Sequence, residues 1–141
     1  MFNPNFTQDL CDFAVREVGQ PYRRPNTVCL SLALRAIDEA TGSTLFADHI
    51  ADLKSAGAMR NFLGREGLGG LIYRMGKAGF EEIPVSHMTV GDIGFTGGPP
   101  FGIGAALMVG RQFLTSHPDT GVVLCSADSL IFVRAVRLKK G

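Results

Sequence analysis

The spacing of apolar residues changes near residue 84, and this change is the strongest constraint on the fold. Before it, apolar side chains such as Phe6, Leu10 and Phe13 recur at helical intervals. After it, short apolar runs alternate with turn-forming residues. These runs lie at 92–96, 105–109, 112–116, 121–125 and 130–138. The sequence therefore predicts an α+β domain, with helices over about residues 5–80 packed on a small antiparallel sheet of about five strands over about 84–138.

The helical part divides at glycine and proline residues. The stripe that begins at Phe6 should end at 19–21, and a second helix should begin near Thr27, whose hydroxyl can cap it, and end at Gly42. Two shorter helices are expected at 58–63 and 71–78, while 43–55 stays ambiguous between helix and loop. The connections between the later runs are too short for parallel crossovers, so an antiparallel meander is expected.

Composition excludes several classes of protein. A chain of 141 residues fits one domain over 1–141, and its net charge of +1 gives no footprint for nucleic acid or an anionic membrane. The longest uncharged stretch, 93–110, is broken by glycine and proline at 97–100, and the first residues lack a signal-peptide pattern. The three cysteines are far apart, so neither a disulfide framework, a metal site nor a cofactor is expected. A soluble intracellular product is the simplest interpretation.

Cys29 is the residue with the clearest chemical potential. It falls in the first turn of an otherwise apolar predicted helix, where the positive end of the helix dipole should lower the pKa of the thiol and favour a nucleophilic thiolate. The alternative is that Cys29 is a small residue of the core, because free cysteines are among the most buried residue types.

The surroundings of Cys29 favour the first interpretation. Gly19-Gln20-Pro21-Tyr22 precedes it, the pair Gly91-Asp92 opens the sheet, and the runs 105–110 and 113–116 follow. This order resembles the NlpC/P60 family of papain-like cysteine peptidases, in particular a short branch from phages and prophages, over about residues 6–138. The resemblance implies a papain-like fold in which Cys29 is the nucleophile and Tyr22 precedes it. It also implies a catalytic histidine where the strand 105–109 begins, and a polar residue on the next strand that orients this histidine.

The chain departs from that pattern at the position of the catalytic base. Gly104 or a neighbour within 102–105 occupies the histidine position, and none of these residues can take a proton. Thr115, at the orienting position, cannot replace a base either. Of the three histidines, His117 is the candidate substitute, although a place in the turn 116–119 is the simpler interpretation. The other two, His49 and His87, are expected on the surface. Val28 replaces the usual acidic residue, and 24–25 replace a Trp-Gly pair.

These departures predict a catalytically degenerate module. The leading hypothesis is a structural component of a phage tail tip or baseplate, made in the host cytoplasm, located in the virion and oligomeric within the assembly. Its partners would be other tail proteins, namely the hub, the distal tail protein and the tape measure. Phe101, in the glycine- and proline-rich loop 97–102, is a candidate anchor for a partner. The alternatives are a peptidoglycan endopeptidase and a cytosolic acyl- or thiol-transfer enzyme, both using Cys29.

Overall fold

The computed structural model describes residues 4–23, 25–53, 56–97 and 104–139, with only the backbone described over 50–66. Its helices are α1 (Phe6–Glu17), α2 (Cys29–Thr41), α3 (Leu45–Leu53) and α4 (Ala56–Lys77), with short 3-10 turns η1 (Val85–His87) and η2 (Ala127–Ser129). Its strands are β1 (Phe80–Ile83), β2 (Ile93–Thr96), β3 (Gly104–Val109), β4 (Gln112–His117), β5 (Gly121–Ser126) and β6 (Arg134–Leu138). The α+β class expected from the sequence is confirmed.

The sheet has six strands in the order β1-β6-β2-β3-β4-β5, and its neighbours pair antiparallel. The predicted meander is therefore wrong in one respect: β6 leaves the edge strand β5 and returns across the sheet to lie between β1 and β2. The strand missing from the prediction is β1, whose two adjacent glutamates, Glu81 and Glu82, hide the alternation typical of a half-buried strand. Pairing with β6 makes β1 a strand despite this pattern.

The helices follow the sequence signals closely, with a correction at one cap. Gly42 ends α2 in the left-handed conformation (φ 77°), as expected. The N-cap of α2, however, is Val28 without a side-chain cap bond, because Thr27 uses its hydroxyl in the preceding loop. The ambiguous connector forms α3. The two short helices expected next are the arms of α4, which separate at Gly67, where φ is 65° and ψ is −171°.

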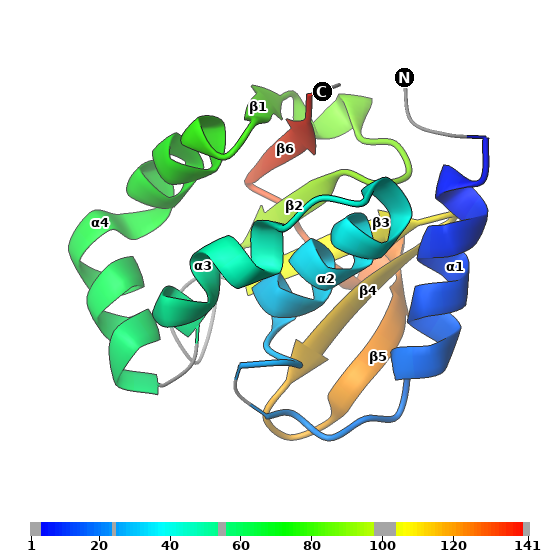
Figure 1. Cartoon of the computed structure of the whole chain (residues 1–141), viewed down its shortest axis with the longest axis horizontal. Helices are drawn as coiled ribbons and strands as arrows, with labels where there is room; N and C mark the ends of the chain where they lie inside the picture. The colour runs from blue at the N-terminus through cyan, green and yellow to red at the C-terminus, as the bar shows by residue number, and fades with distance from the viewer. Residues whose placement is uncertain (1–3, 24, 54–55, 98–103, 140–141) are drawn as a thin grey trace.

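The helices cover one face of the sheet, with α2 in front of β3 and β4 (Figure 1). The core between them contains Phe13, Ile37 and Phe95, each almost fully buried. The crossover from β5 to β6 covers part of the other face, where the Phe132 ring contacts the Phe113 ring at 4.8 Å between centroids, with the two planes tilted by 50°. Within the described residues, no helix is both long and apolar enough to cross a membrane.

Candidate functional site

Cys29 is the first residue of α2, and its thiol lies against the beginning of β3. The Sγ atom accepts the backbone N–H of Ala105 at 3.4 Å, although 76 positions separate the two residues. The side chain is partly buried and packs against the hydrophobic core. The start of the helix and the start of the strand, which the resemblance expected to form one site, thus lie in contact.

Ala105 is the residue of β3 that faces Cys29. Ala105, Leu107 and Val109 belong to the core on the helix side of the sheet, so Gly104 points to the opposite face. A side chain at Gly104 would meet the hydroxyl of Thr96 on β2 at 2.6 Å. Of residues 102–105, where the resemblance expects the base, 102 and 103 lie outside the described residues, and Ala105 is the described residue that contacts the thiol. Its methyl group has no acid or base function.

The electrostatics of Cys29 differ from the sequence expectation. Burial raises the pKa of the thiol, and N–H groups of Ala105, Leu30 and Cys29 itself offset this only in part. The predicted lowering by the helix dipole is wrong in direction, because desolvation of the thiolate outweighs the amides around it. The raised pKa favours the protonated thiol at neutral pH.

The three histidines are held elsewhere. The ring of His117, at the end of β4, accepts the backbone N–H of Asp119 through Nδ1 at 3.1 Å, and its side chain is 44% exposed. This is the turn role that the sequence favoured. His49 bonds through Nδ1 to the Leu45 carbonyl within α3, and His87 lies in η1. Within the described part of the chain, none of the hydrogen bonds of Cys29 comes from a histidine.

The polar residue of β4 that faces the start of α2 is Ser116, which sequence reasoning missed. Its hydroxyl is buried and donates to the carbonyl of Thr27. Thr115 points to the other face and donates to the Ala105 carbonyl at 2.8 Å. The alternation along β4 could have revealed this, because Leu114 is a core residue and Ser116 must share its face.

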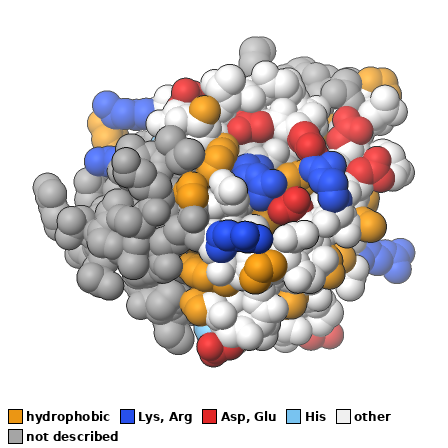
Figure 2. All heavy atoms as spheres, turned by 60° about the horizontal axis from the view of Figure 1, so that its bottom comes forward, with side chains coloured by type: hydrophobic (Ala, Val, Ile, Leu, Met, Phe, Trp, Pro, Cys, Tyr) orange, Lys and Arg blue, Asp and Glu red, His pale blue; other side chains and the backbone are white. Residues whose placement is uncertain are grey.

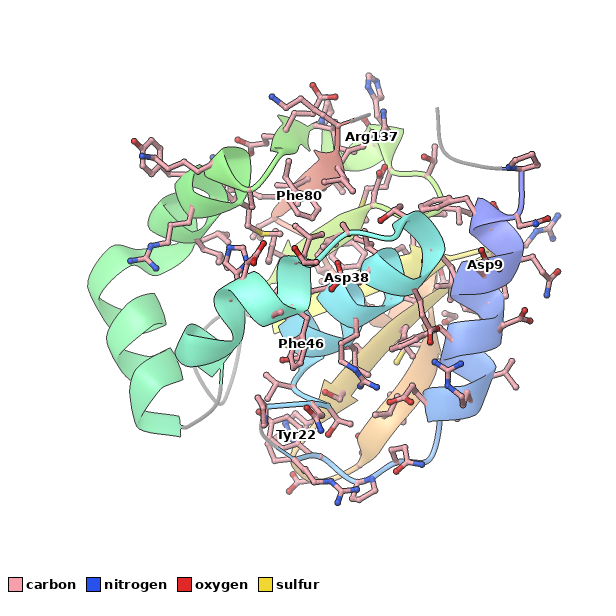
Figure 3. All side chains as sticks on the ribbon, in the orientation of Figure 1. Asp9, Tyr22, Asp38, Phe46, Phe80 and Arg137 are labelled. Atoms are coloured by element: carbon pink, nitrogen blue, oxygen red, sulfur yellow. The ribbon has the colours of Figure 1, made fainter. Side chains whose placement is uncertain are left out.

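The loop that carries Tyr22 is fixed at both ends. Thr27 donates its hydroxyl to the Pro21 carbonyl at 2.8 Å and accepts the N–H of Arg23 at 2.6 Å. At the other end, the N–H of Gly19 and the carbonyl of Gln20 both bond to Val122 of β5, at 3.0 and 2.9 Å. Tyr22 is half-buried against the core in this loop, at the foot of α2 (Figure 3). The loop therefore holds the first turn of α2 in place against the sheet.

The Gly91-Asp92 pair has an architectural role. The buried Asp92 carboxylate accepts Nε and Nη2 of Arg137 on β6, at 3.0 and 2.8 Å, and the N–H of Thr89 at 2.8 Å. Gly91 has φ 95°, and a side chain there would meet the ring of Phe6 at 2.6 Å. These contacts join the start of β2 to β6 and to α1.

Two further expectations concern partners and metals. Phe101, the candidate anchor, lies outside the described residues. Among the residues that the structure describes, no cluster of histidine, cysteine or carboxylate side chains could hold a metal ion.

Comparison with known proteins gives one family. A family model described as a domain of unknown function (DUF6950) matches residues 3–135. A comparison with curated protein sequences gives no match.

Proposed function

The chain belongs to the DUF6950 family, and we propose that it is a structural component of a phage tail tip, built on a papain-like domain that has lost its catalytic base. The observation that carries the proposal is the contact between Cys29 and Ala105. A cysteine peptidase needs a base within hydrogen-bond reach of its sulfur, both to form the thiolate and to protonate the leaving amine. Here an alanine faces the sulfur.

The rest of the site supports a role without catalysis. Two hydroxyls of β4 bond to residues next to Cys29: Ser116 donates to the Thr27 carbonyl, and Thr115, from the other face of the sheet, donates to the Ala105 carbonyl. Hydrogen bonds of this kind stabilise the loop and the strands without activating a nucleophile. As a subunit, the chain would pack against tail proteins of the hub, distal tail and tape-measure kinds, and its net charge of +1 places no electrostatic barrier against them.

One observation favours the alternative, a peptidoglycan endopeptidase. Cys29 is the first residue of a 13-residue helix, and backbone N–H groups point at its sulfur. Such an enzyme would need a base from outside the described residues of this chain, for example from a neighbouring subunit. The thiol chemistry therefore separates the two proposals.

The deciding experiment is the pH dependence of iodoacetamide labelling at Cys29. A variant with Cys11→Ser and Cys125→Ser leaves Cys29 as the one thiol, and adding Cys29→Ser gives the matched control. Because burial raises the pKa of this thiol, the labelling rate should increase only above the usual thiol range, about pH 8.5, and stay low near pH 6. A labelling plateau near pH 6, together with release of peptidoglycan fragments that Cys29→Ser abolishes, would establish the enzyme instead.

The assembly part of the proposal needs its own test. Purified virions should contain the chain in a fixed ratio to other tail proteins, measured by quantitative mass spectrometry. Its absence from virions would contradict the structural role, whatever the thiol does.

A further inference from the structure

The two edge strands of the sheet, β1 and β5, differ in how they are protected against pairing with another chain. β1 carries the adjacent charges of Glu81 and Glu82, and charged side chains on an edge strand oppose the addition of a further strand. β5 runs Gly-Val-Val-Leu-Cys-Ser, so it has neither a charged residue nor a proline. The edge at β5 is therefore suited to accept a further strand.

The part of β5 that is open to pairing is short. Its beginning is occupied, because Val122 exchanges backbone hydrogen bonds with Gly19 and Gln20, at 3.0 and 2.9 Å. Val122 therefore points its backbone groups away from β4, and the period of two along a strand gives Leu124 and Ser126 the same direction. Within the described residues, Leu124 makes no backbone hydrogen bond on that side. Beyond Ser126 the chain turns into η2, so the open stretch is 124–126.

The open stretch is complementary to a second copy of itself that runs antiparallel. With Leu124 of each copy opposite Ser126 of the other, the N–H of Ser126 donates to the Leu124 carbonyl. The N–H of Leu124 donates to the carbonyl of Ser126, which as the N-cap of η2 keeps one lone pair for this bond. A two-fold axis repeats both bonds. Each copy bends into η2 where residues 19 and 20 of the other copy occupy the edge, whereas a longer strand would collide with them.

The limits of the open stretch fix the register of this pairing. A shift in one direction brings Val122 into the pairing, although its backbone groups are already bonded to Gly19 and Gln20. A shift in the other direction leaves Leu124 opposite η2, where the partner strand has ended. In the remaining register, Cys125 lies directly opposite Cys125 of the other copy, as a pair without mutual backbone hydrogen bonds.

The surroundings of the open stretch do not oppose a second copy. In Figure 2, charged side chains of both signs alternate with apolar patches, without a broad area of one sign, and the net charge is +1. Val15 is 74% exposed and Val18 is 43% exposed, and α1 lies at the β5 end of the sheet (Figure 1), so a second copy paired through β5 approaches this apolar surface. We infer that two copies of this chain associate through their β5 edges, about a two-fold axis at Cys125.

This inference extends the proposed structural role and rests on it for the expectation that the chain acts within an assembly. The register is tested by cross-linking a full chain in which Cys11→Ser and Cys29→Ser leave Cys125 as the one thiol. Diamide takes two electrons and two protons from the facing thiols as the S–S bond forms. The Cα atoms of such a pair lie about 4.5 Å apart, within the disulfide range of about 4.4–6.8 Å, so a linked dimer should form.

The matched control for cross-linking moves the thiol along the same face of β5. Val123→Cys, combined with Cys125→Ser and the two other serine changes, places the thiol opposite Ala127 of the other copy instead of opposite its own equivalent. Cross-linking of this chain should be slower by about tenfold or more, because two thiols separated by this shift are outside disulfide reach. Equal rates for the two chains would overturn the inferred register.

The association itself is tested by sedimentation velocity on the purified full chain. Wild type should show a concentration-dependent dimer, and Leu124→Pro should weaken it by about tenfold or more, because it removes the N–H that points away from β4. Cys125→Lys and Cys125→Glu should each weaken the dimer as well, since like charges then meet at the axis, and an equimolar mixture of the two chains should recover it. Thermal unfolding of every variant separates loss of association from loss of folding, and the charge variants keep the test valid if Leu124→Pro does not fold.

A wild type that stays monomeric, or charge variants whose mixture does not recover the dimer, overturns the inference. Association by a chain that is absent from virions would contradict the tail role alone. A monomeric chain that is present in virions would contradict this inference alone.

Discussion

The cluster of Asp92, Arg137 and Thr89, here called the corner, differs from the surroundings of Cys29 in how many hydrogen bonds its central side chain accepts. Asp92 is 2% exposed, and its two oxygens accept bonds from Arg137 and from the N–H of Thr89. Cys29 accepts the backbone N–H of Ala105 at 3.4 Å. In the sequence, both regions carry motifs of the same resemblance.

This difference separates residues needed for folding from residues needed for chemistry. The corner joins β2 to β6, so a change there affects the stability of the sheet in any version of the protein. A base beside Cys29 would contribute to turnover and little to the fold, so an alanine at that place is compatible with the same architecture. A domain that is retained for its shape is expected to keep the first kind of residue and lose the second.

The largest expected loss of stability is at the corner around Asp92. Asp92→Ala leaves the Arg137 guanidinium and the Thr89 N–H without their acceptor, and should lower the free energy of unfolding by about 3 kcal/mol. Glu39→Ala is the control, since it breaks a pair that is half exposed at both ends and should cost no more than about 0.5 kcal/mol. Urea unfolding measures both. Equal losses in the two variants would show that the corner is an ordinary surface ion pair.

The second-largest expected loss of stability is in the loop that carries Tyr22, which lies beside Cys29. Gly121 has φ 74°, and a side chain there would clash with the Gln20 carbonyl, so Gly121→Ala should lower the free energy of unfolding by about 2–3 kcal/mol. Gly110→Ala is matched to it, with φ 70° but open space around the new methyl group, and should cost about 1 kcal/mol. Similar losses of stability in both variants would mean that the loop shifts to accommodate the methyl group and does not hold the start of α2.

Local signals predicted much of the fold. The apolar stripe of α2 and its end at Gly42 depend on residues close together in the chain, and so do the turns between β3, β4 and β5. The place of β6 could not be predicted, because it depends on distant contacts such as Arg137 with Asp92. The strand β1 was missed for the same reason: it exists through its pairing with β6 and has no alternating pattern of its own.

The candidate site was predictable to a similar degree. The order of motifs brought Cys29 and the start of β3 together, but it did not say which side chain of β3 faces the sulfur. That choice depends on the pleat of the strand, which turns Ala105 towards α2 and Gly104 away. The direction of the pKa shift at Cys29 also required the structure, because it is decided by burial.

The smallest predicted effect lies two residues beyond Cys29 and has the opposite sign. Within the described residues, the hydroxyl of Ser31 is the buried side-chain polar group that has no hydrogen-bond partner. Ser31→Ala removes a desolvated hydroxyl and introduces a better helix former, so it should raise the free energy of unfolding by about 1 kcal/mol. Ser116→Ala, which loses a satisfied bond to Thr27, should lower it by about the same amount. A loss of stability in Ser31→Ala would show that this hydroxyl has a partner and that the start of α2 is as fully bonded as the corner at Asp92.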